Sequence, residues 1–472
     1  MKSLTFSTLL IFLLLVLGAT FRLYNINFDN LWVDEISSFW ISNPDFDFKE
    51  SYLNHKSLEE TPFLFNFIIK FFFTIFGYDI NLARIIPCIF SIFGILSVIY
   101  LSKLLSKKNA YIFAAFLTSF NIFLIGYSQE LRVYSTLFFF INISLIFFYK
   151  SYENDNKINH SIFIIVTLFS IFLHPFSIIL YIAYCLYTFL LLLNSKIENK
   201  TIFVSLVIIL LFSILYYIFY FQDSLLLGSL KSPTWISQPE LKFFTNFYFS
   251  KFFGSRLVGL FFLITLIFLS FKYFSKIIRL EKIALIFIFL ILSYMLPLIY
   301  TYMIQPILLS RYIVFVLIPI IILISHFTFE LENNKIKFYI IFALCLFTLS
   351  NFVTEQTFKQ FYKDRRIYKP EFVKSLKIIT DSNNKNYSLK VNPGVKILKD
   401  PWINAVNNYL DYIKIEQNLD INFKEYEKLK YENIWIICVH DLNENDCALP
   451  NKFTSIERFK LNRLDLIFAS IN

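Results

Sequence analysis

Long apolar runs dominate the chain, and their lengths predict helices that cross a membrane. Ser3–Phe21 and Thr201–Phe221 contain no charged residue, and about 18 or more apolar residues in a helix span the roughly 30 Å hydrocarbon core. Reading every such run at a helical rise of about 1.5 Å per residue predicts about eleven spans. They are 3–21, 86–102, 110–126, 133–149, 160–174, 176–193, 201–221, 257–275, 283–301, 312–329 and 337–353.

The run 160–193 is predicted to form two spans rather than one. Its roughly 34 residues would reach about 51 Å as a single helix, far more than the bilayer core needs. His174-Pro175 interrupts the run, and proline cannot continue a helix without the loss of a hydrogen bond. Two antiparallel helices with His174 at the turn follow.

The segment Phe63–Phe76 is apolar, but it is too short to span the bilayer. It has about 14 residues, with Lys70 in its middle, whereas a span needs about 20. Counting it as a span would invert every later loop and place the lysines outside. We therefore expect a helix that lies on, or dips into, the outer interface.

The basic residues orient the spans. With Lys2 and the N-terminus in the cytoplasm, every short inside loop is basic, as the positive-inside rule requires. These loops hold Lys103, Lys107, Lys108, Lys150, Lys157, Lys196, Lys200, Lys272, Lys276, Arg279, Lys282, Lys335 and Lys337. The segments that then face outside are the loops 22–85, 127–132, 222–256 and 302–311, the His174 turn and the tail 354–472.

The pattern divides the chain into two expected domains. Residues 1–353, including the outer loop 22–85, form an all-α polytopic membrane domain, and residues 354–472 form a small extracytoplasmic α/β domain. In this tail Glu371–Ile379 is expected to be a helix, and Asn433–Val439 and Leu464–Ile471 read as strands.

Composition agrees with a membrane protein that carries one soluble appendage. The 472 residues are 57% hydrophobic and 17% charged, whereas soluble domains are about 45–50% apolar and about 25% charged. The net charge of +10 lies in loops that orient the spans, so we expect no nucleic-acid partner. Cys438 and Cys447 lie in the tail, where they could form a disulfide outside the cytoplasm.

Asp34 and Glu35 lie in the first outside loop, which begins at Arg22, and an ionisable residue near the bilayer is a functional candidate. A carboxylate here could act as general base toward a hydroxyl, or hold a cation. The alternative is an ordinary solvated loop, in which acidic residues are common.

Four further sites share the outer side under this topology. Glu60 precedes Thr61-Pro62 and could simply favour a helix N-terminus, while Glu130 and Arg132 could pair with each other. His174 could be a structural hydrogen-bonding group, bind a metal together with a carboxylate such as Glu60, or contact a phosphate. Arg311 beside Tyr312 suits either an interfacial anchor or bidentate phosphate contact.

Three motifs in order resemble membrane glycosyltransferases of the GT-C class, closest to the protein O-mannosyltransferase and aminoarabinose-transferase-like group (glycosyltransferase families 39 and 83). Arg22 with Leu31-Trp32-Val33-Asp34-Glu35 resembles the first-loop motif. Glu60-Thr61-Pro62-Phe63, then Phe76-Gly77 and Ala83-Arg84-Ile85-Ile86-Pro87, is similar to "PPL…FG…aRLPS". Tyr127-Ser128-Gln129-Glu130-Leu131-Arg132-Val133-Tyr134 resembles "YSQEaRmY". His174 and Ser310-Arg311-Tyr312 match later landmarks more loosely. The usual double proline is Pro62-Phe63 here, and Cys88 replaces the final serine.

The resemblance implies a GT-C-like fold and transfer of a sugar from a polyprenyl-phosphate carrier to a lipid, glycan or protein, with inversion, outside the cytoplasm. It implies Asp34 as general base, supported by Glu35 and Glu130. It implies that Arg311, Arg132 and Tyr312 hold the donor phosphate, and that Glu60, Tyr134 and His174 support the acceptor. A divalent metal at Glu60 and His174 stays open, because the group includes members that need none.

Three other classes of membrane protein are alternatives. The first-loop motif argues against a structural or receptor-like protein whose tail binds a partner. A transporter or flippase for lipid-linked saccharides often shows inverted repeats and charges deep within spans, and the sequence shows neither. A ligase or polymerase of lipid-linked saccharides would lack the early Asp-Glu loop. We expect an integral protein of the bacterial plasma membrane.

Overall fold

The computed structural model describes most of the predicted spans and part of the tail. The described residues are 6–26, 30–59, 61–106, 108–196, 200–226, 236, 238–240, 250–353, 369–382, 387–392, 399–419, 433–439 and 455–470. They fall into two compact units. We call Met1–Tyr24 with Ile85–Thr354 the helical unit, and Asn25–Arg84 with Glu355–Asn472 the mixed unit. The structure thus groups the first outer loop with the tail, whereas the sequence assigned that loop to the membrane domain.

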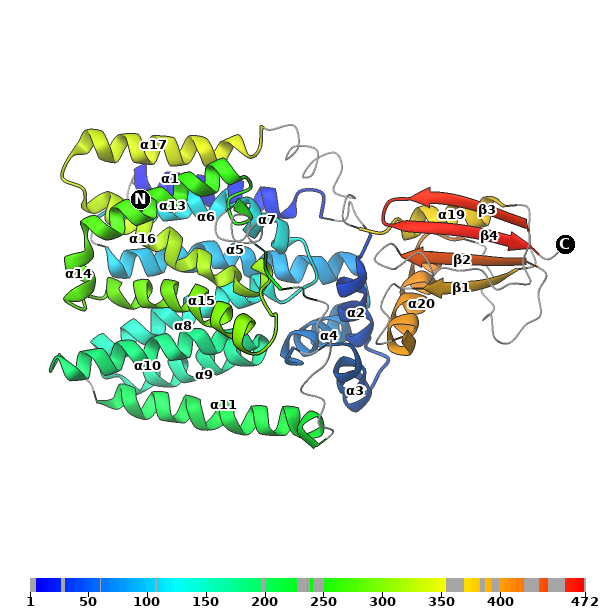
Figure 1. Ribbon diagram of the computed structural model, residues 1–472, viewed down its shortest axis with the longest axis horizontal. Helices are drawn as coiled ribbons and strands as arrows, with labels where there is room; N and C mark the ends of the chain where they lie inside the picture. The colour runs from blue at the N-terminus through cyan, green and yellow to red at the C-terminus, as the bar shows by residue number, and fades with distance from the viewer. Residues whose placement is uncertain are drawn as a thin grey trace, which may run out of the picture. The chain divides into compact units, whose positions relative to one another are not determined.

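Each predicted span contains a helix (Figure 1). The elements are α1 (Phe6–Leu23), α5 (Ile80–Leu105), α6 (Ala110–Ser119), α7 (Ile122–Ser128), α8 (Tyr134–Glu153), α9 (Lys157–Leu173), η1 (Pro175–Ser177), α10 (Ile178–Leu193), α11 (Thr201–Leu226), α13 (Arg256–Lys272), α14 (Phe274–Ile278), α15 (Ile283–Met303), η3 (Ser310–Val316), α16 (Leu317–Glu330) and α17 (Asn334–Ser350). Among the described residues, seven helices are long and apolar enough to cross a membrane, or eight if the bent pair α6–α7 is one span. The predicted number of eleven therefore stays a prediction.

Two helix breaks lie where polar side chains satisfy the freed backbone groups. α9 ends at Leu173 and η1 begins at Pro175, so the predicted turn at His174 is confirmed; the His174 ring accepts from the Phe176 N–H at 3.2 Å. α6 and α7 meet at 55°. There the Asn121 side chain accepts from the Leu124 N–H at 2.9 Å and donates to the Phe252 carbonyl at 3.0 Å. Such caps replace the hydrogen bonds that a helix end lacks.

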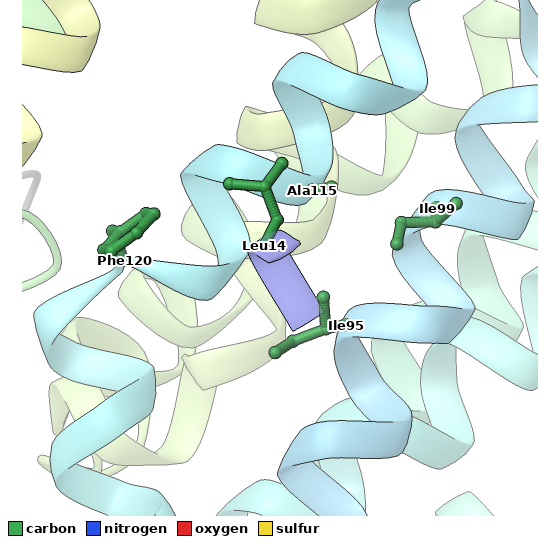
Figure 2. Close-up of a cluster of buried hydrophobic side chains, with 5 residues drawn as sticks. All are labelled: Leu14, Ile95, Ile99, Ala115 and Phe120. Atoms are coloured by element: carbon green, nitrogen blue, oxygen red, sulfur yellow. The ribbon is translucent and has the colours of Figure 1, made fainter. Parts of the chain in front are cut away.

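One apolar cluster joins α1, α5 and α6 (Figure 2). Its buried members are Leu14, Ile95, Ile99, Ala115 and Phe120. Gly18 lets α1 approach closely, because a Cβ there would lie 2.8 Å from Ile95 Cδ1 and 3.0 Å from Ser119 Oγ. Small residues at such crossings are typical of packing between membrane helices.

The mixed unit combines three helices of the first loop with the folded tail. The loop forms α2 (Val33–Ile41), α3 (Phe48–Leu58) and α4 (Leu64–Phe76). The tail forms α19 (Phe372–Asp381), α20 (Lys399–Glu416) and the strands β1 (Ser388–Asn392), β2 (Asn433–Val439), β3 (Ser455–Leu461) and β4 (Leu464–Ser470). The sheet order is β1-β2-β4-β3, with β1 and β2 parallel and the other pairs antiparallel.

The predicted tail helix and both predicted strands are confirmed as α19, β2 and β4, whereas β1, β3 and α20 were missed. β3 reads Ser-Ile-Glu-Arg-Phe-Lys-Leu, with three charged residues among seven, so it lacks the apolar run that marks β2. Pairing with β4 makes it a strand. Cys438 is disulfide-bonded. The predicted pairing with Cys447 stays a prediction, because Cys447 lies outside the described residues. Cys88, Cys185 and Cys345 form no disulfide.

The short apolar segment after Pro62 is a helix, α4, of 13 residues. Its Lys70 ammonium donates to the Asn43 and Phe46 carbonyls at 2.5 and 2.6 Å. Burial lowers the pKa of Lys70, while Glu50 and other nearby acids oppose that shift. Phe71 and Phe76 are more than half exposed. A location of α4 in the outer interface stays a prediction.

Candidate functional site

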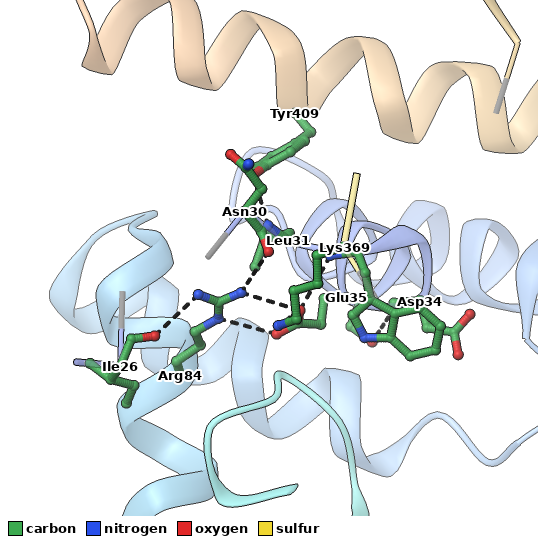
Figure 3. A network of polar contacts seen from close by, with 10 residues as sticks. Ile26, Asn30, Leu31, Asp34, Glu35, Arg84, Lys369 and Tyr409 are labelled. Atoms are coloured by element: carbon green, nitrogen blue, oxygen red, sulfur yellow. Dashed lines mark hydrogen bonds and ion pairs between the residues drawn. The ribbon is translucent and has the colours of Figure 1, made fainter. Parts of the chain in front are cut away.

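The first turn of α2 carries the acidic pair. Trp32 is the N-cap residue, Asp34 and Glu35 follow in the first turn, and the Glu35 carboxylate accepts from the Trp32 N–H at 3.3 Å. Carboxylates at a helix N-terminus are stabilised by the helix dipole. Asp34 is half-buried and Glu35 is fully buried. In Figure 3 the Asp34 carboxylate points away from the Arg84–Glu35 pair.

Glu35 is the centre of a buried charge cluster with Arg84 and Lys369 (Figure 3). Arg84 binds the carboxylate through two nitrogens, at 3.1 and 3.2 Å, and the Lys369 ammonium lies 2.9 Å from Glu35 Oε2. The side chains of Glu35, Arg84 and Lys369 are 0%, 1% and 12% exposed. A carboxylate is buried at low cost only when it is paired and hydrogen-bonded. The cluster therefore engages both oxygens of Glu35.

Arg84 and Tyr409 hold the backbone of the segment that leads into α2. Arg84 also donates to the Ile26 and Asn30 carbonyls at 3.1 and 3.0 Å. The buried Tyr409 hydroxyl of α20 accepts from the Leu31 N–H at 2.8 Å, and burial raises the pKa of this phenol. The approach to Asp34 is thus held by one residue of α5 and by the tail.

A second polar group lies between α2 and α4. Ser37 donates to Glu59 Oε1 at 2.8 Å. The buried His55 ring contacts the Thr61 carbonyl at 2.6 Å and the Asn66 amide at 2.9 Å, so it fixes the turn before α4. Glu60 lies outside the described residues, and its predicted role in acceptor or metal binding stays a prediction.

The helical unit gathers another set of predicted site residues around His174. The His174 and Tyr312 ring centres are 5.3 Å apart, and Tyr134 lies 6.5 Å from each. The Arg311 guanidinium is 5.7 Å from the Tyr312 ring centre. His174 lies in the turn between α9 and η1, and burial, reinforced by the charges of Arg132 and Arg311, lowers its pKa to about 3. The imidazole is therefore neutral near pH 7, and two cationic side chains, Arg132 and Arg311, act on it.

The predicted residues thus form two sets. Asp34 and Glu35 belong to the mixed unit, and Arg132, Tyr134, His174, Arg311 and Tyr312, with Glu130 two residues before Arg132, belong to the helical unit. A cavity shared by the two sets stays a prediction.

Two residues of the sequence motifs have structural roles that the motifs did not reveal. Arg22 is fully buried and donates to Ser91 Oγ at 2.7 Å and to the Gly18, Thr118 and Ser119 carbonyls at 3.0 Å. The Gln129 amide donates to the Arg22 and Tyr24 carbonyls at 2.8 and 2.9 Å. Thr118 and Ser119 end α6 and Arg22 lies in the last turn of α1, where backbone carbonyls lack partners within their helix.

Comparison with known proteins identifies the fold. Residues 60–217 match the family model described as dolichyl-phosphate-mannose-protein mannosyltransferase. The structure is similar to apo ArnT from Cupriavidus metallidurans, with a TM-score of 0.63 and 10% identity over 98% of both chains. The chain has an ArnT-like GT-C fold.

Two further solved structures share this fold. ArnT from the same organism bound to undecaprenyl phosphate gives a TM-score of 0.53 at 11% identity over 97% of both chains. The apo oligosaccharyltransferase of Archaeoglobus fulgidus gives 0.52 at 11% identity, over 93% of this chain and 70% of that chain. No curated protein matches in sequence. Identities this low carry the fold, and residue roles have to be argued from the geometry.

The expected metal site at Glu60 and His174 lies only partly within the described residues. Within the described ranges, no three His, Cys, Asp or Glu side chains converge as metal ligands. Glu60, one half of the expected pair, lies outside those ranges. The Glu60–His174 metal site stays a prediction.

Proposed function

We propose that this protein is a membrane glycosyltransferase of the GT-C class that transfers a sugar from a polyprenyl-phosphate carrier to a lipid, glycan or protein acceptor, with inversion, on the outer side of the membrane. The observation that carries the proposal is the difference in burial and pairing between the two adjacent acids. Glu35 is fully buried and bound to Arg84 and Lys369, whereas Asp34 is half-buried and points away from that pair (Figure 3). Asp34 is the acid that can reach a hydroxyl of an acceptor.

In this proposal Asp34 is the general base. It takes the proton of the acceptor hydroxyl as the hydroxyl oxygen attacks the anomeric carbon, and the bond from that carbon to the carrier phosphate breaks with inversion. Glu35 holds the helix that carries Asp34, and Glu130 orients the acceptor.

The leaving group is a phosphate, which cationic groups stabilise as its charge develops. Arg311 and Arg132 supply two guanidinium groups near the neutral His174, and the ring centres of Tyr312 and Tyr134 lie 5.3 and 6.5 Å from that of the imidazole. A neutral imidazole can donate one hydrogen bond to a phosphate or to an acceptor without adding charge. Support for a polyprenyl donor comes from the similar ArnT structure that is bound to undecaprenyl phosphate.

We further propose that the protein lies in the bacterial plasma membrane with its N-terminus in the cytoplasm and its tail outside. The basic inside loops support this orientation. The chemistry assigned to Asp34 and the arginines requires no cofactor, and a divalent metal held by Glu60 and His174 would instead orient the acceptor.

The test is sugar transfer in vesicles that contain a polyprenyl-phosphate sugar. Asp34→Asn should lower transfer by about 10²- to 10⁴-fold, the contribution of a positioned general base, while the protein still inserts. Asp45→Asn is the matched control, because Asp45 is an exposed acid of the same loop, and it should keep full activity.

Two outcomes would count against the proposal. Full activity of Asp34→Asn would remove Asp34 from the mechanism. Movement of the lipid-linked sugar across the bilayer without a new glycosidic bond would favour a flippase.

A further inference from the structure

Among the residues that the structure describes, two cations, Arg84 and Lys369, pair with the single carboxylate of Glu35. Arg84 alone neutralises Glu35 with two hydrogen bonds, yet Lys369 adds a second positive charge at 12% exposure. Removing an ammonium from water costs free energy that a single shared carboxylate offsets only in part. Neutralising Glu35 therefore does not by itself explain why Lys369 is buried beside it.

Lys369 comes from the far end of the chain and is held in place there. It lies 334 residues after Glu35. Its backbone carbonyl accepts from the Asn462 side chain at 3.1 Å. Asn462 also exchanges two hydrogen bonds with Glu371, at 3.1 and 3.2 Å. Asn462 lies in the turn between β3 and β4, so the β-hairpin fixes the backbone that presents the Lys369 ammonium.

Glu35 Oε2 is where the tail meets the first turn of α2. This oxygen accepts from Lys369 at 2.9 Å, from Arg84 at 3.2 Å and from the Trp32 N–H at 3.3 Å. The Lys369 contact is the shortest of the three. Charge-assisted hydrogen bonds are roughly twice as strong as neutral ones, so Lys369 restrains the rotamer of Glu35, and through it the N-cap Trp32.

We infer that Lys369 is a positioning residue, through which the folded tail locks the first turn of α2 and thereby aims Asp34. The inference rests on the proposed function of Asp34 as general base. Lys369 acts through Glu35 and does not touch the reacting atoms. The tail is then part of the catalytic apparatus, because the ammonium is delivered only when the segment around Lys369 is held by the β3–β4 turn.

The test compares four purified full-length proteins: wild type, Lys369→Met, Lys369→Arg and Lys377→Met. Lys377 is an exposed lysine of α19 and serves as the matched control. Arg84 still pairs Glu35 in every variant, so all should fold. For Lys369→Met we expect kcat about 10- to 100-fold lower, the effect of a misaimed catalytic group, with the KM for the polyprenyl-phosphate sugar unchanged. Lys369→Arg should recover most of the activity, and Lys377→Met should match wild type.

A second readout is independent of sugar transfer. Hydrogen exchange of the Leu31–Ile36 amides should be about tenfold faster in Lys369→Met, because the first turn opens more often. A double-mutant cycle adds specificity: in a Glu35→Gln background, Lys369→Met should have little further effect, since the carboxylate through which it acts is gone.

The outcomes separate the inference from the proposed function. Wild-type protein that transfers no sugar from the lipid carrier defeats the proposed function, and the exchange data then decide the positioning role alone. Unchanged exchange together with unchanged kcat in Lys369→Met overturns the inference. The inference is also overturned if the activity lost in Lys369→Met merely matches the fraction of unfolded protein. It is equally overturned if the effects of Lys369→Met and Glu35→Gln on activity are additive in the double variant.

Discussion

Replacing Arg84 by methionine is the sharpest perturbation of the mixed unit. Methionine fills much of the space but provides no donor. The Glu35 carboxylate loses two hydrogen bonds, at 3.1 and 3.2 Å, and the Ile26 and Asn30 carbonyls lose one each. Glu35 is fully buried, so water does not replace these contacts without local opening.

The magnitude follows from the burial of the pair. Breaking a buried ion pair by removal of one partner costs about 3–5 kcal/mol. Lys369 remains 2.9 Å from the carboxylate and compensates part of the charge, so we expect the lower end, about 3 kcal/mol. For a domain of about 150–250 residues, each kcal/mol shifts Tm by about 2–4 °C. Arg84→Met should therefore lower the Tm of the mixed unit by about 6–12 °C.

Tryptophan fluorescence during heating of the detergent-purified protein measures this shift. Four of the five tryptophans, Trp32, Trp40, Trp402 and Trp435, lie in the mixed unit, so the signal reports on that unit. The triple variant Arg84→Met/Glu35→Gln/Lys369→Met is the control, because it removes all three charges of the cluster and should be more stable than Arg84→Met alone. A Tm within about 2 °C of wild type for Arg84→Met, or a triple variant less stable than the single one, would refute the reasoning that the pair is a buried structural lock.

Three further predictions concern the rest of the molecule. Arg22→Met strands the α6 carbonyls and should cost on the order of 3 kcal/mol, seen as earlier loss of helical circular dichroism on heating; an unchanged melting curve would contradict the clamp. Alkylation of denatured, unreduced protein should label three of the five cysteines and, after reduction, all five; five labels without reduction would exclude a disulfide. The folded pKa of His174 is about 3, and the unfolded value is about 6.5. The unfolded state therefore binds the proton first, and stability should fall as pH drops below about 6.5, less steeply in His174→Gln, as acid melts would show.

The topology has its own test. Cysteine at position 107 should react with membrane-impermeant reagents only from the cytoplasmic side, and cysteine at position 130 only from outside. The opposite labelling of either position would invert the orientation that the basic loops predict.

Local properties of the sequence determined where the helices of the membrane domain lie. Apolar length decides whether a segment can span a bilayer, and proline at 175 decides where a helix must end, so α9 and η1 meet at the predicted turn. The same holds for β2 and β4, whose apolar runs stand out in a polar tail. The three sequence motifs could also be read without the fold. They indicated a resemblance to the GT-C class, which the family model and the ArnT-like fold support.

Only the tertiary structure distinguished the burial and the partners of the two adjacent acids. Asp34 and Glu35 are neighbours with the same chemistry, but one is half-buried and the other is paired with Arg84 and Lys369. Lys369 lies 334 residues away, and no periodicity or motif links positions that far apart. The identity of a buried partner depends on which side chains the folded chain brings within about 3 Å. For this reason the sequence could name the acidic pair, and the fold was needed to show which of the two acids is paired with Arg84 and Lys369.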